Sequence, residues 1–156
     1  MEEMKKNFIP ALLLGLFLAS CGGGSTRDET DEVPTSMLAA EVSTDPMKNK
    51  GIGPISSITL ADEVDAEMAD AGRVLFEQMC TACHKPDRNF VGPAPKDVLT
   101  RRTPEWIMNM MLNPEEMTQK DPIAKELLLE FNGMPMTNQS LSEEQARQML
   151  EYFRTL

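Results

Sequence analysis

From residue 62 onward, apolar side chains recur every three or four positions, as in amphipathic helices, and no run alternates in the way of a strand. The pattern predicts four helices: 63–79, one from Thr103 that ends before Pro114, one from Asp121 to Phe131, and one from Ser142 onward. Loops rich in proline and glycine separate them. We therefore expect an all-α, loop-rich domain over 62–156.

Capping signals support two of these helix starts. Thr103 is a typical N-cap residue, and Pro104 after it suits the first helical position. Ser142 and Gln145, three residues apart, form the pattern of a capping box. A domain of this size buries a small core, so a bound cofactor would contribute to its stability.

The first twenty residues have the layout of a secretory signal peptide. Lys5 and Lys6 precede an apolar run over 11–19, which is short for a transmembrane helix. This layout predicts export, to the periplasmic side of a Gram-negative-type bacterium. The segment 1–20 is then removed and forms no part of the fold.

The end of the signal, L-A-S-C at 18–21, resembles the lipobox of bacterial lipoproteins. The resemblance implies cleavage before Cys21 and acylation of its thiol, which anchors the chain to a bilayer. The alternative is an ordinary signal with an incidental cysteine. The lipobox reading fits an anchor in either the inner or the outer membrane.

Residues 21–61 are small, polar and acidic, with no aromatic residue and no lasting apolar period. Such a composition buries too little surface to order itself, so we expect a flexible tether here. The net charge of -10 argues against a nucleic-acid partner.

The candidate chemistry lies in C-T-A-C-H, which holds Cys80, Cys83 and the only histidine, His84. This spacing is the attachment signature of a c-type haem, because two thiols one turn apart reach the two vinyl groups and the histidine then meets the iron. A redox disulfide would need a surrounding βαβ pattern, which is absent. Zinc needs four ligands, and the motif offers three. A structural disulfide across so short a loop would stabilise little.

Together with its surroundings, this motif is similar to the small monohaem class I cytochromes c. Gly72 and Phe76 precede the cysteines where these cytochromes place a glycine and an aromatic residue that pack on the last helix, and Tyr152 matches their partner. The resemblance implies a cytochrome c fold, with three to five helices around one covalent haem c. It also implies that the carbonyl of Pro93, in V-G-P, accepts a hydrogen bond from the ligand histidine.

The same resemblance implies a methionine sulfur as the second axial ligand. In N-G-M-P-M-T, Met134 directly precedes a proline as in many family members, so it is the expected ligand, with Met136 as the alternative. The methionine-rich stretch 108–120 departs from the family and is expected to form an altered loop beside the haem.

Basic residues surround the haem motif in an otherwise acidic domain: Lys85, Arg88, Lys96, Arg101 and Arg102. They form either a rim that steers an acidic partner or a solvated loop with one arginine paired to a haem propionate.

Six-coordinate iron has no open site, so we expect a monomeric one-electron carrier and not an enzyme. Its partners would be redox proteins of an extracytoplasmic respiratory chain: a quinol-oxidising complex as donor, and a terminal oxidase or a nitrous oxide reductase-type enzyme as acceptor. The alternative function is an open-haem peroxidase or gas-binding sensor, which requires both methionines to stay off the iron.

Overall fold

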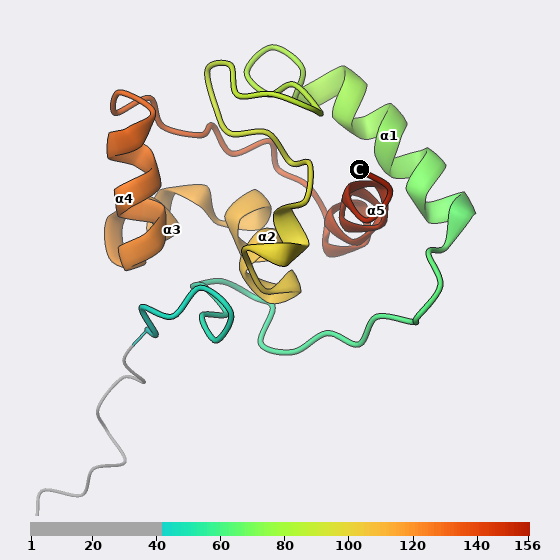
Figure 1. Ribbon diagram of the computed structural model, residues 1–156, viewed down its shortest axis with the longest axis horizontal. Coiled ribbons are helices and arrows are strands. Elements are labelled where there is room, and N and C mark those ends of the chain that lie inside the picture. Colours follow the sequence, from blue (N-terminus) through green and yellow to red (C-terminus); the bar gives the residue numbers. More distant parts are fainter. Residues whose placement is uncertain (1–41) are drawn as a thin grey trace, which may run out of the picture. The chain divides into compact units, whose positions relative to one another are not determined.

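A computed structural model describes residues 42–156, which all belong to one folded unit (Figure 1). The predicted signal peptide and Cys21 lie outside the described residues. The described part consists of helices and loops, without strands: α1 (Ala66–Met79), the 3₁₀ turn η2 (Val98–Thr100), α2 (Pro104–Leu112), α3 (Pro114–Lys120), α4 (Pro122–Glu130) and α5 (Glu143–Phe153). The all-α prediction is confirmed. Within 42–156, no helix combines the length and apolar character that a membrane crossing requires.

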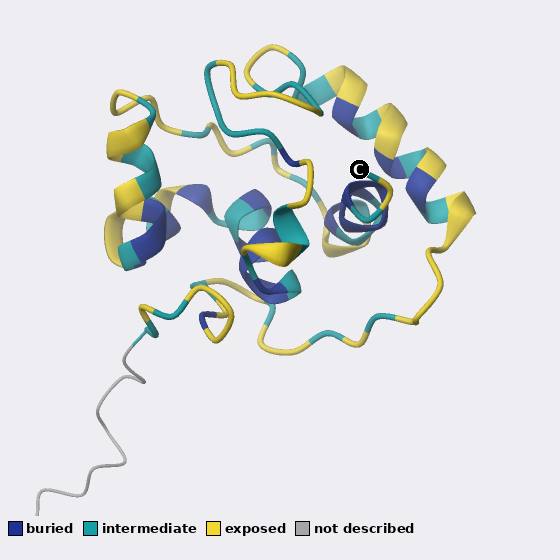
Figure 2. Cartoon of the chain, in the orientation of Figure 1, coloured by how far each residue is buried: buried dark blue, intermediate teal, exposed yellow. Residues whose placement is uncertain are grey.

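The terminal helices α1 and α5 cross at a very short distance. A Cβ atom on Gly72 would lie 2.1 Å from the backbone oxygen of Gln148, so only glycine permits this approach. The ring of Phe76 packs beside Tyr152, with centroids 5.5 Å apart, and edge-on against Phe153 at 5.9 Å. Figure 2 shows α5 buried along most of its length, whereas α1 buries one face only.

The stretch 108–120 is helical, so the expectation of an altered loop is wrong. Its first residues complete α2, and Pro114 opens α3 at a position where the missing N–H costs nothing. Met117 is fully buried and Met111 is 5 % exposed. The methionines are therefore core residues of two short helices, and the chain bends between them at Asn113.

Residues 43–60 pack against the helices, which differs from the expectation of a tether that is too polar to order. We call this segment the strap. Asn109 of α2, 1 % exposed, donates to the carbonyls of Lys50 and Ile55 and accepts from the N–H of Ile55. Apolar residues of the strap also contact the core: Ile52, Ile55, Ile58 and Leu60. Buried side-chain amides thus satisfy a backbone that has no partner strand.

Candidate functional site

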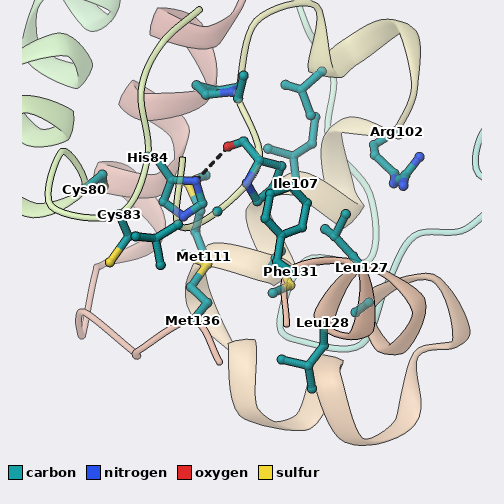
Figure 3. A pocket seen from close by; sticks show the side chains of 18 of the residues that line it. Cys80, Cys83, His84, Arg102, Ile107, Met111, Leu127, Leu128, Phe131 and Met136 are labelled. Atoms are coloured by element: carbon teal, nitrogen blue, oxygen red, sulfur yellow. Dashed lines mark hydrogen bonds between the residues drawn. The ribbon is translucent and has the colours of Figure 1, made fainter. Parts of the chain in front are cut away.

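A cavity of about 450 Å³ opens between the loop that follows α1, the helices α2 and α4, and the segment that precedes α5. The loop contributes Cys80, Cys83 and His84, all of which line the cavity (Figure 3). The other walls are mainly apolar and include Ile107, Met111, Leu127, Phe131 and Met149. The structure therefore brings the C-T-A-C-H motif to the rim of an apolar hollow large enough for a cofactor.

The imidazole of His84 is held by its neighbours. Its Nδ1 atom lies 2.8 Å from the carbonyl oxygen of Pro93. A carbonyl only accepts hydrogen bonds, so Nδ1 carries a proton, and in the neutral ring this leaves the lone pair on Nε2. Figure 3 shows the ring directed toward the side of the cavity where Met111 and Met136 lie. A histidine fixed in this way is a preorganised metal ligand.

Gly92 explains how Pro93 reaches the ring. A Cβ atom on Gly92 would lie 2.5 Å from Cε1 of His84, so the chain passes against the imidazole where no side chain fits. The N–H of Gly92 donates to the carbonyl of Cys83 at 2.9 Å, which ties the two ends of this part of the loop together.

The two cysteines are not joined to each other, and Cys83 is exposed. Burial, and then the neighbouring Cys83, raise the pKa of the Cys80 thiol to about 11. Cysteines of C-x-x-C redox sites have lowered pKa values, so this environment is unlike theirs. Among residues 42–156, no group of three or more His, Cys, Asp or Glu side chains is placed to hold a metal ion. The geometry thus favours neither a redox disulfide nor a zinc site.

Both candidate methionine ligands line the cavity, but their surroundings differ. Met134 is 59 % exposed and lies in the turn that ends α4, where its N–H donates to the carbonyl of Phe131. Asn132 and Gly133 take left-handed conformations to form this turn, with φ of 59° and 70°. Met136 is half-buried and packs against the hydrophobic core.

Four of the five basic residues near the motif divide into two groups. Arg101 and Arg102 line the cavity, whereas Arg88 and Lys96 are exposed outside its lining. Arg88 pairs with the adjacent Asp87 at 3.2 Å. The guanidinium of Arg102 stacks on the Trp106 ring, 5.2 Å from its centroid.

The sequence did not assign the α4 wall of the cavity, which Leu127, Leu128 and Phe131 form. Their helical spacing was visible, but spacing alone does not tell that this face meets the haem motif. The one indication in the sequence was that this helix directly precedes the N-G-M-P-M segment, which carries the candidate methionine ligands.

The residues present fit a covalently bound haem. Two unpaired thiols stand at the rim, a histidine nitrogen with a free lone pair faces an apolar hollow, and a methionine sulfur is available from the chain before α5. The fold and this site define a small monohaem c-type cytochrome.

Over residues 67–153, more than half of its length, the chain matches the family described as cytochrome c oxidase, cbb3-type, subunit III, and it belongs to this family. It is similar to the solved structure of a cytochrome c from Rhodothermus marinus, with 50 % identity and a TM-score of 0.64 over 66 % of this chain and 88 % of that one. An engineered form of that cytochrome, bound to a carbene intermediate, is 48 % identical with a TM-score of 0.61, over 66 % of this chain and 88 % of that one.

A further similarity, 28 % identity over 117 residues, links the chain to band 4.1-like protein 2 of Mus musculus. It covers 72 % of this chain but only 10 % of that protein. Because the match covers so small a part of that protein, we infer nothing about this chain from that protein's activity.

Proposed function

We propose that this protein is a membrane-tethered one-electron carrier that holds one covalent haem c. The observation that carries the proposal is the hydrogen bond from His84 Nδ1 to the Pro93 carbonyl, which directs Nε2 into an apolar cavity beside two thiols that are not bonded to each other. When bound, the haem supplies a one-electron couple between ferric and ferrous iron.

The residues of the chain have distinct roles in this proposal. Cys80 and Cys83 would hold the cofactor through thioethers, and His84 would provide a nitrogen ligand to its iron. Pro93 would orient the imidazole for its role as a ligand. The mainly apolar wall would keep water away from the bound cofactor.

We infer that Met136, the alternative ligand, and not Met134 supplies the axial sulfur. A ligand needs a side chain held in the cavity, and Met134 is 59 % exposed, whereas Met136 packs against the core. Loss of the Met136 sulfur would leave an open haem, the site that a peroxidase or gas sensor requires.

The family supports an oxidase as redox partner, because its description names a cbb3-type oxidase. A quinol-oxidising complex would be the donor, and a nitrous oxide reductase-type enzyme is an alternative acceptor. Arg88, which pairs with Asp87, and Lys96 are exposed and would face an acidic partner, while Arg101 and Arg102, which line the cavity, would bind the cofactor's carboxylates. Acylation of Cys21 would hold the carrier at a membrane and raise its effective concentration near such partners.

The test is the mass of the denatured protein, purified from cells that attach haem to exported cytochromes. We expect the chain to retain the mass of one haem in denaturant. Cys80→Ala combined with Cys83→Ala should lose it, and Cys21→Ala, which removes a thiol outside the site, should keep it. A wild-type chain without covalent haem would contradict the proposal.

A further inference from the structure

A carboxylate is buried behind the cavity wall, at the junction of α3 and α4. Asp121 is 0 % exposed. Its Oδ2 atom accepts from the side-chain amide of Asn49 at 2.7 Å. Its Oδ1 atom accepts from the indole N–H of Trp106 at 3.2 Å and from the N–H of Ala124 at 2.8 Å. Every partner is a donor, which matches an ionised carboxylate because that group only accepts.

The negative charge is stabilised without a direct counter-ion. Among residues 42–156, no lysine or arginine lies within ion-pair distance of Asp121. Instead it caps the N-terminus of α4, where the helix dipole favours an anion. Three hydrogen bonds replace its hydration. The charge is therefore fixed in place and shielded from the solvent that screens surface charges.

Only a single layer of residues separates this charge from the cavity. Trp106 and Ala124, which both donate to Asp121, also line the cavity. Arg102, whose guanidinium stacks on the Trp106 ring, also lines the cavity. A fixed charge so close to the site acts on it through protein and not through water.

The strap contacts this carboxylate through Asn49. Asn49 is 1 % exposed, and its own carbonyl accepts from the hydroxyl of Thr103, the N-cap residue of α2, at 2.6 Å. Its side-chain oxygen accepts from the N–H of Gly51 at 2.7 Å. One asparagine thus bonds the cap residues of both α2 and α4, and both it and Asp121 are buried from solvent.

We propose that Asp121 is a positioning residue whose buried charge lowers the reduction potential of the haem, and that Asn49 keeps this charge dry and in place. The inference rests on the proposed function. A negative charge stabilises the ferric form, which carries one more positive charge than the ferrous form. The strap, expected from its sequence to be a spacer, then contributes to the properties of the redox site.

The experiment is a redox titration of the full-length haem-loaded protein and its variants at constant pH and ionic strength. Asp121→Asn, which keeps the shape and removes the charge, should shift the midpoint potential to a more positive value. Asp121→Ser, which keeps an oxygen to cap α4, should shift the midpoint potential in the same direction. It takes the place of Asp121→Asn if the asparagine variant does not fold. Glu126→Gln is the matched control, because it removes an exposed charge from the same helix and should shift the potential less.

Asn49→Ala distinguishes the effect of the Asp121 charge from the effect of the contacts around it, because it removes a hydrogen bond to the carboxylate and leaves the charge. It should lower the thermal unfolding midpoint, while its potential rises less than that of Asp121→Asn because the carboxylate remains. The inference is overturned if both Asp121 variants have the wild-type potential, or if Asn49→Ala raises it as much as they do. A wild-type protein without a reversible couple would overturn the proposed function itself, and this inference with it.

Discussion

The Nδ1 atom of His84 donates a hydrogen bond of 2.8 Å to the carbonyl of Pro93, nine residues further along the chain. Gly92 makes this possible, because any side chain there would collide with the imidazole. The bond sets the tautomer and the direction of the ring before any ligand arrives. The loop between α1 and η2, which has no regular structure, thus fixes the direction of the His84 imidazole.

The choice of the axial methionine leads to the first prediction. Met136→Leu should abolish the red methionine–iron charge-transfer band of the ferric protein, because it removes the half-buried sulfur. Met134→Leu is the matched control and should retain the band, since that side chain is 59 % exposed. The reverse result would assign the ligand to Met134.

The close crossing of α1 and α5 leads to the second prediction. Gly72→Ala places a methyl group 2.1 Å from the Gln148 carbonyl and should force the helices apart. We expect a loss of about 1–3 kcal/mol in the free energy of unfolding, measured with urea. Val74→Ala, at a 42 % exposed position of the same helix, should change it by no more than about 0.5 kcal/mol. Equal stabilities of the two variants would refute this account of the crossing.

The strap provides the third prediction. Asn109→Ala removes the side-chain amide that donates two hydrogen bonds to the strap backbone and accepts one from it. It should lower the free energy of unfolding by about 1–3 kcal/mol in the same urea assay. Gln119→Ala, at an exposed position of α3, serves as the control and should be close to neutral. If Asn109→Ala is also neutral, the strap is not held as described.

The lipobox resemblance leads to the fourth prediction. Cys21→Ser should move the protein from the membrane fraction to the soluble exported fraction, because it removes the residue that would be acylated. Each buried methylene of an acyl chain contributes about 0.8 kcal/mol to membrane binding, so the change should be nearly complete. The absorption spectrum should stay the same. A Cys21→Ser protein that stays in the membrane fraction would argue against the lipid anchor.

The local features of this protein were predictable from its sequence. The C-T-A-C-H motif is contiguous, and capping residues mark the starts of α2 and α5 at Thr103 and Ser142. These signals act over a few residues, so the fold class and the position of the histidine follow from them.

The strap was not predictable in this way. Its order comes from contacts between residues 54 to 72 positions apart, such as Asn109 with Ile55 and Asn49 with Asp121. The composition of the segment is polar and small. It does not indicate that a buried side-chain amide of α2 hydrogen-bonds the backbone of this segment. The environment of Met134 also escaped prediction, because it depends on the left-handed turn at Asn132 and Gly133 that ends α4.

The central claim is that this chain holds a haem with histidine and methionine ligands and passes single electrons. The most direct test is a spectroelectrochemical titration of the purified wild-type protein, followed by addition of carbon monoxide to the reduced form. We predict one reversible one-electron transition, a methionine–iron band in the ferric state, and no rapid binding of carbon monoxide. A ferric spectrum without that band, together with rapid carbon monoxide binding, would contradict the account and indicate an open haem.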